Sequence, residues 1–225
     1  MPDNIEYAIL RSPKRKTLSI IIRSNSQVDV LAPQRMPEAV IHQFVQNKQT
    51  WIQKKLHFNH NIRASYQAKL FQQGELFQLL GKSYRLNIHN HHTEIHIADA
   101  QLIVPALPAD KLKQKIIIWY KQQAQQHCQQ RAQHFSASIG KTPASIGVKA
   151  YKSRWGSCHQ DGRIYFNYRL IMAPARIIDY VIVHELCHLI HHNHGKDFWQ
   201  RVESIMPDYH QANTWLKNNG LSLDL

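Results

Sequence analysis

The 225-residue chain is poor in cysteine, in acidic residues and in long apolar runs. Its three cysteines, Cys128, Cys158 and Cys187, lie far apart and form no C-x-x-C pair. They therefore exclude a disulfide framework and favour a reducing compartment. The longest apolar runs, residues 116–120 and 180–183, are far too short to span a bilayer. Since the first residues show no basic segment followed by an apolar one, we expect no signal peptide and a cytoplasmic location.

The shortage of acidic residues leaves the chain strongly basic. It has 28 Lys and Arg against 15 Asp and Glu, a net charge of +13 with His neutral. This excess favours anionic partners such as nucleic acid, nucleotides or acidic surfaces, although a basic surface without such a partner explains it equally well. An apolar fraction of 43% is normal for a globular protein and argues against wholesale disorder. The length suits one large domain or two small ones.

Strand patterns dominate the first hundred residues. Short β-branched or alternating runs occupy residues 17–22, 28–32, 75–80, 84–88, 94–97 and 102–104. Apolar residues three and four apart predict a helical insertion near residues 37–58. We therefore expect a β-rich N-terminal region over residues 1–107, with a boundary near 105–110, where Pro105 and Pro108 interrupt the chain.

The second part of the chain, residues 108–225, is predicted to be mainly helical. A long helical pattern runs from Asp110 to about His134, with a glutamine-rich polar face. Strand patterns follow at residues 146–150 and 163–167, and three helical patterns continue from there. The whole chain therefore predicts an α+β fold.

The segment His184-Glu-Leu-Cys-His188 has the spacing of a metal-binding helix. Helical geometry puts His184 and His188 on one face, one turn apart, where two imidazoles can bind the same ion. Glu185 can reach a metal-bound water as general base. Composition alone predicts about 0.03 chance occurrences of H-E-x-x-H in so histidine-rich a chain. A core helix with two incidental histidines is therefore the weaker interpretation.

A catalytic site of this kind needs a third protein ligand and leaves a fourth position for water. His194 follows His188 by six residues, and Asn193 tolerates a left-handed conformation that can turn the chain back toward the metal. His191 and His192 are alternatives, because His191 follows His188 by three residues and can face the same side. Histidine ligands suit zinc, and nickel or cobalt can occupy the same three nitrogens.

Four motifs stand out in this part of the chain: Tyr151-Lys-Ser-Arg-Trp-Gly-Ser-Cys158, His184-Glu-Leu-Cys-His188, Asn193-His194 and Pro207-Asp-Tyr209. Together they resemble the YgjP-like metallopeptidase-domain family, whose relatives include the SprT-like zinc proteins. The resemblance is densest over residues 151–216. It implies a zincin-like fold in which His184, His188 and His194 hold one zinc ion and Glu185 is the catalytic base. It also places residues 154–158 near the active site.

Two further residues are candidates for substrate binding. Arg154 can hold a carboxylate or phosphate through two hydrogen bonds, and a packing pair with Trp155 is the alternative. Asn167 is expected at a strand end shortly before the metal helix, where it can hydrogen-bond to a ligand or substrate. Asp179 and Asp197 are candidate partners for a histidine N–H, with helix-start or surface roles as alternatives.

These residues predict a metal-dependent hydrolase in which the ion lowers the pKa of bound water and Glu185 accepts its proton. Peptide bonds are the leading substrate class, because the family resemblance and the implied zincin arrangement point there. The first alternative is pyrophosphohydrolase activity on a nucleoside triphosphate such as UTP, which the resemblance also allows. The second is a nucleic-acid-associated, SprT-like zinc protein, although the sequence contains no RNP motif or C2H2 finger.

Overall fold

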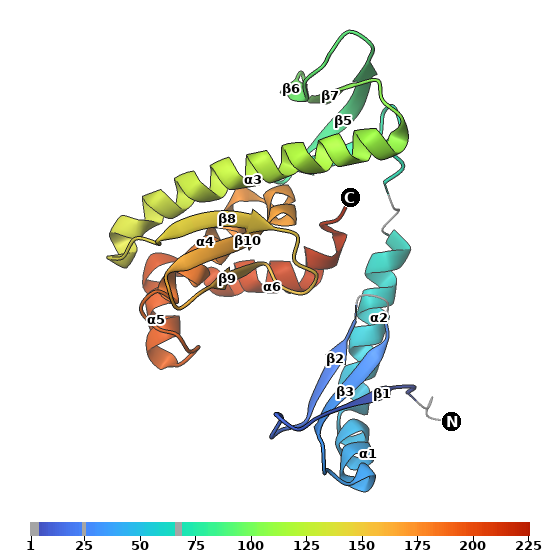
Figure 1. Ribbon diagram of the computed structural model, residues 1–225, viewed down its shortest axis with the longest axis vertical. Helices are drawn as coiled ribbons and strands as arrows, with labels where there is room; N and C mark the ends of the chain where they lie inside the picture. The colour runs from blue at the N-terminus through green and yellow to red at the C-terminus, as the bar shows by residue number, and fades with distance from the viewer. Residues whose placement is uncertain (1–4, 24–25, 66–68) are drawn as a thin grey trace. The chain divides into compact units, whose positions relative to one another are not determined.

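The computed structural model describes residues 5–23, 26–65 and 69–225, and the chain divides into two compact units, Met1–Gln67 and Ala68–Leu225 (Figure 1). Its sheets and helices form an α+β fold, which confirms the predicted class. Over the described ranges, none of the helices combines the length and the apolar character needed to cross a membrane.

The first unit is a three-stranded sheet followed by two helices. Strands β1 (Ala8–Ser12), β2 (Ser19–Ile22) and β3 (Val28–Pro33) lie in the order β1-β3-β2, with β1 parallel and β2 antiparallel to β3. Helices α1 (Glu38–Asn47) and α2 (Gln49–Ser65) follow, where the sequence predicts a helical insertion. One face of β3 and the two helices supply a small core: Val28, Val30, Ala32, Ile41, Val45 and Ile52.

The second unit begins with a four-stranded sheet. Strands β4 (Leu76–Leu79), β5 (Lys82–His89), β6 (His96–Ala98) and β7 (Gln101–Pro105) lie in the order β4-β5-β7-β6. Alternate side chains point inward because successive strand residues face opposite sides. The buried ones are Phe77, Leu79, Leu86, Leu102 and Val104.

Helix α3 (Ala109–Ile139) joins this sheet to the rest of the unit. Most of its buried residues recur every four positions and belong to the same core as the four-stranded sheet: Leu112, Ile116, Tyr120, Ala124, Cys128 and Ala132. The Tyr120 hydroxyl donates a hydrogen bond of 2.7 Å to the Gln78 carbonyl. The second unit therefore begins at Ala68, whereas the sequence predicts a boundary near residues 105–110. The prolines there separate β7 from α3 without separating their cores.

A second sheet, with the order β8-β10-β9, lies beside α3 (Figure 1). Strand β10 (Arg163–Asn167) is parallel to β8 (Ser145–Lys149) and antiparallel to β9 (Gly156–Cys158). Strand β9 is thus an edge strand. The short 3-10 helix η1 (Tyr168–Met172) leads from β10 to α4 (Ala175–Cys187).

Helix α4 is the centre of this part of the unit, because it contacts α3, β9, α5 (Lys196–Ile205) and α6 (Tyr209–Asn219). A two-fold hydrogen-bonded ion pair, at 2.7 and 2.8 Å, joins Arg131 of α3 to Asp179 of α4. The chain ends with a further 3-10 turn, η2 (Gly220–Ser222). These contacts fix α4, which carries the first residues of the candidate site.

Candidate metal centre and active site

Helix α4 carries His184 and Glu185, and His188 is its C-cap residue. Its apolar residues are buried around the whole helix, which is typical of a helix enclosed in a core: Ile178, Val181, Ile182, Val183 and Leu186. Packing therefore holds the helix axis in place. Side chains at its C-terminal end are positioned by a rigid element rather than by a mobile loop.

The structure brings His184, His188 and His194 together. The Nε2 atom of His194 lies 3.0 Å from Nε2 of His184 and 3.1 Å from Nε2 of His188. One ligand atom from each histidine falls within 4.8 Å of the others, a grouping that fits a single metal ion. Three imidazole nitrogens with an open fourth position are a typical donor set for catalytic zinc.

The tautomer of His188 is fixed by its other ring nitrogen. Its Nδ1 lies 3.0 Å from the backbone carbonyl of His191, which can only accept, so Nδ1 carries the proton and Nε2 keeps its lone pair. Of the alternative third ligands, His191 thus contributes its carbonyl. Neither its ring nor that of His192 belongs to the three-histidine group found among the described residues.

Helix α5 supports the three imidazoles with aromatic rings. The centroid of the Phe198 ring lies 4.9, 4.5 and 4.7 Å from those of His184, His188 and His194. Trp199 stacks on His194, with centroids 5.6 Å apart. These apolar neighbours limit the movement of the imidazoles and reduce their solvation.

Neither predicted aspartate is a hydrogen-bond partner of the histidines. Asp179 forms the ion pair with Arg131, so its role is to join α4 to α3. Asp197 lies in the first turn of α5, where a carboxylate favours the helix start.

Burial favours the neutral form of His184 and His188. It lowers the pKa of His184 to about 3, and the neighbouring charges of His188 and His194 act in the same direction. Burial also lowers the pKa of His188. Neutral imidazoles are the form that binds a metal, so these two residues need not lose a proton at neutral pH before binding.

Glu185 is a buried carboxyl group beside the triad, with only 7% of its surface exposed. Burial raises its pKa to about 7, and the Arg154 charge and a hydrogen bond from the Cys158 backbone N–H partly oppose that rise. A carboxyl group with a pKa near neutrality can both accept and release a proton under physiological conditions.

Strand β9 passes directly over this carboxyl group at Gly156. A Cβ atom at Gly156 would lie 2.6 Å from both Cγ and Oε1 of Glu185. The φ angle of Gly156 is outside the left-handed region, so close approach and not backbone conformation demands glycine here. Sequence reasoning missed this role, since the glycine within Arg-Trp-Gly-Ser does not reveal what lies opposite it.

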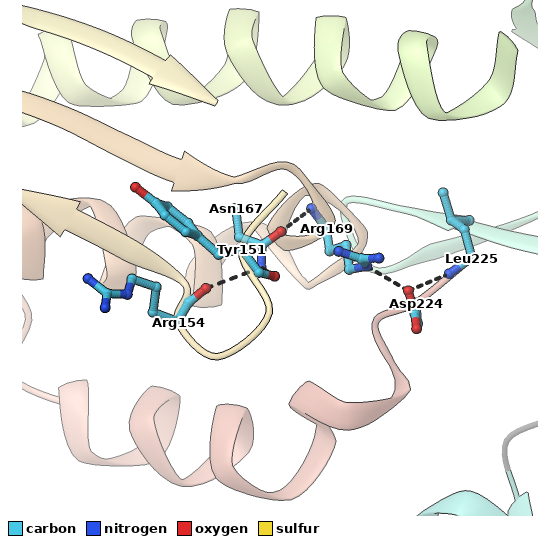
Figure 2. Close-up of polar contacts among 6 residues, drawn as sticks. All are labelled: Tyr151, Arg154, Asn167, Arg169, Asp224 and Leu225. Carbon is cyan, nitrogen blue, oxygen red and sulfur yellow. Dashed lines mark hydrogen bonds and ion pairs between the residues drawn. The ribbon is translucent and has the colours of Figure 1, made fainter. Parts of the chain in front are cut away.

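The segment of residues 151–155 precedes β9 and carries Arg154. The guanidinium group of this exposed residue lies 5.7 Å from the ring centroid of Tyr151. The structure thus pairs Arg154 with Tyr151 and not with Trp155, the alternative partner in the sequence. Figure 2 shows the side chains of Arg154 and Tyr151 extending toward the same side.

Asn167 lies at the end of β10 and is buried. Its Nδ2 donates to the backbone carbonyls of Tyr151 (2.9 Å) and Arg154 (3.1 Å), and its Oδ1 accepts from the backbone N–H of Arg169 (3.3 Å) (Figure 2). Both N–H groups of the side chain therefore bind the protein's own backbone. Neither of these N–H groups is left to bind a substrate, the role that the sequence predicts for Asn167.

Comparison with known proteins assigns the family. A sequence profile described as YgjP-like, metallopeptidase domain, matches residues 16–219. Among solved structures, the crystal structure of the metallopeptidase zymogen of Pyrococcus abyssi abylysin is 18% identical with a TM-score of 0.38, over 40% of this chain and 90% of that chain. No curated protein matches significantly. Since the profile spans most of the sequence, the chain belongs to the YgjP-like metallopeptidase-domain family and is a metal-dependent hydrolase.

Proposed function

We propose that this protein is a zinc metallopeptidase. The observation that carries the proposal is the convergence of three imidazoles beside a buried carboxyl group whose pKa is about 7. His184, His188 and His194 would hold the ion. Zinc in such a site lowers the pKa of a bound water and polarises a carbonyl group.

Glu185 supplies the acid–base chemistry. Its carboxylate takes the proton of the attacking water, and the protonated carboxyl group then gives that proton to the leaving amine. A pKa near 7 suits both steps. Gly156 and the Cys158 backbone N–H hold the carboxyl group in one position, which limits the reorganisation needed during the reaction.

The free edge of β9 favours a peptide as substrate. This strand pairs with β10 on one side, and in the described part of the chain no strand pairs with its other side. Unpaired backbone groups at a sheet edge bind extended peptides by adding a strand. A peptide bound along β9 would pass next to Glu185, because Gly156 contacts that residue.

Metal analysis tests the site directly. Protein purified without a metal-affinity column should carry about one equivalent of zinc, and His184→Ala should lose it, because three protein ligands are needed for a stable catalytic site. His192→Ala is the matched control and should keep the metal, since His192 is exposed in the same segment and outside the triad. Equal metal in wild type and His184→Ala would overturn the proposed site.

Activity tests the reaction. Glu185→Gln should retain the metal and lower cleavage of casein or short peptides about 100- to 10,000-fold, because the amide cannot accept the proton. A fully metal-loaded wild type that cleaves none of these substrates would exclude the peptidase assignment.

A second candidate is hydrolysis of a nucleoside triphosphate. Arg154 favours it, because this exposed guanidinium forms no ion pair with the described residues and can bind phosphate through two hydrogen bonds. Release of UMP and pyrophosphate from UTP, weakened in Arg154→Ala and absent in Glu185→Gln, would support this activity. No turnover of any triphosphate would dispose of it.

A further inference from the structure

Asn167 connects β10 to the segment of residues 151–155 through several hydrogen bonds. Its side chain donates to the carbonyls of Tyr151 and Arg154 (Figure 2). Its backbone N–H donates to the Trp155 carbonyl at 2.8 Å. Only 4% of Asn167 is exposed. Buried amide hydrogen bonds of this kind are costly to remove, because each unpaired carbonyl loses its partner without regaining water.

The segment needs this support because it has no secondary structure of its own. Residues 151–155 lie between β8 and β9, outside both strands, and the bond from the Asn167 N–H to the Trp155 carbonyl is the one backbone hydrogen bond that links them to β10 among the described residues. Tyr151 has a second contact with β9, because its hydroxyl group lies 2.7 Å from that of Ser157. Asn167 therefore attaches this loop to β10. The loop leads directly into β9, which contacts the carboxyl group of Glu185 at Gly156.

We infer that Asn167 is a positioning residue that acts through this loop. By holding the carbonyls of Tyr151 and Arg154, it keeps the Arg154 charge close to Glu185 and brings β9 onto the carboxyl group at Gly156. The inference rests on the proposed function, since it assigns importance to the surroundings of Glu185. According to this inference, Asn167 does not bind the substrate directly. It positions the residues that surround Glu185.

The C-terminal segment continues the same network. The backbone N–H of Arg169 donates to the side-chain oxygen Oδ1 of Asn167, and Nε of Arg169 donates to Oδ1 of Asp224 at 2.6 Å (Figure 2). The backbone N–H of Leu225 donates to the same oxygen at 3.0 Å, and Leu223 is buried. Asp224 thus holds the side chain of Arg169 in place. Because it contacts Asn167 only through Arg169, Asp224→Asn should increase the mobility of residues 151–155 less than a substitution of Asn167 does.

Hydrogen–deuterium exchange of the metal-loaded protein tests the inference without a substrate. Asn167→Asp keeps the size and the acceptor but cannot donate when ionised, so β9 should be held less firmly and exchange of its amides, residues 156–158, should become about tenfold faster. Exchange in α4 and the bound metal should stay as in wild type. The control is Asn87→Asp, which removes a side-chain donor from β5 to Gln101 and should leave the loop unchanged.

Unchanged exchange of residues 156–158 in Asn167→Asp would overturn the inference. Faster exchange throughout residues 68–225, with loss of metal, would overturn it as well, because Asn167 would then act on general stability. If Asn167→Asp does not fold, Asn167→Ser serves the same test, since one hydroxyl group cannot donate to both carbonyls. Because exchange and metal content need no substrate, failure of the peptidase proposal leaves this test decisive.

Activity then shows whether the loop transmits the effect. In a double-mutant cycle on kcat/KM, Asn167→Asp and Arg154→Ala should be non-additive by about threefold or more, because both act through one loop. Strict additivity would contradict the inferred role of Asn167 in placing Arg154.

Discussion

Each of the two units buries a carboxylate, and the two carboxylates differ in whether they form an ion pair. Asp29 in β3 of the first unit is 1% exposed and forms an ion pair with Arg23. Glu185 in the second unit is 7% exposed, forms no ion pair with any residue that the structure describes, and has its pKa raised to about 7. A paired buried acid stabilises a fold. An unpaired one beside three histidines is costly to keep ionised and is useful for moving a proton.

This comparison separates a unit whose buried acid is paired from one whose buried acid lies unpaired in the candidate site, and core substitutions test the separation. Ile41 and Ile178 are fully buried in the first and second units, and alanine at either should lower the free energy of unfolding of its own unit by about 2–5 kcal/mol. Only the unit that binds the metal should lose stability when a chelator is added. Calorimetry with and without chelator measures both effects.

The expected control is that Ile41→Ala keeps about one equivalent of metal while Ile178→Ala binds it less tightly, because the proposed ligands His184 and His188 lie in α4 and at its C-cap. A single transition that both substitutions shift equally, with equal metal loss, would break the distinction between the units.

The contact between β9 and Glu185 gives the next largest effect. Gly156→Ala would place Cβ 2.6 Å from Oε1 of Glu185, so the strand or the carboxyl group must move. Because a shift of about 1 Å can lower activity about 100-fold, we expect kcat to fall by that order with the metal retained. Gly195→Ala is the control, since its methyl group would meet no atom within 4 Å. Equal kcat values for the two variants would show that β9 can shift to accommodate the added methyl group without lowering the activity.

The raised pKa of Glu185 predicts that the site reduces stability at neutral pH. In the metal-free protein, a pKa raised from 4.5 to about 7 favours folding below pH 4.5, and this contribution is lost as the pH rises through 7. His184 acts oppositely, because its pKa falls from 6.5 to about 3, and its contribution is lost as the pH falls through that range. At pH 8 only the Glu185 penalty remains.

Metal-free Glu185→Gln should therefore be more stable than wild type at pH 8 by about 1–3 kcal/mol. The difference should shrink as the pH falls from 7 toward 4.5. Urea unfolding at several pH values measures it. A variant that is less stable than wild type at pH 8 would show that the Arg154 charge and the Cys158 N–H outweigh burial.

Local patterns explain which parts of this molecule could be predicted from sequence. The α+β class and the long helix predicted from Asp110 to about His134 follow from apolar periodicity, which depends on neighbours a few residues away, and the observed helix continues to Ile139. The closeness of His184, Glu185 and His188 follows from helical spacing in the same way. His194 could be ranked but not selected over His191, because the path of the turn between them decides which ring faces the others.

Long-range contacts explain the rest. The prolines at 105 and 108 mark the end of a strand correctly, yet the sheet before them shares its core with α3, and no local pattern shows such sharing. The carbonyls that Asn167 binds belong to residues 13 and 16 positions earlier in the chain. Their approach depends on sheet order and loop path, so the residue was recognisable as a candidate while its partners were not.

The smallest effect is expected on the surface of the first unit. Arg11 donates to the Gln34 and Met36 carbonyls, and Arg15 donates to the Thr17 carbonyl, so these two of the four basic residues in 11–16 bind the protein itself. The exposed Lys14 and Lys16 lie beside the edge strand β1, where like charges oppose pairing with other chains.

Replacing both lysines by alanine should change the free energy of unfolding by less than about 0.5 kcal/mol and leave the metal and the activity unaffected, because solvent-exposed charges contribute little. It should increase aggregation at high concentration, which light scattering can follow. If the same variant instead lowers a salt-sensitive affinity for RNA or DNA, the basic segment is a nucleic-acid contact, and the first unit has a binding role in addition to its structural one.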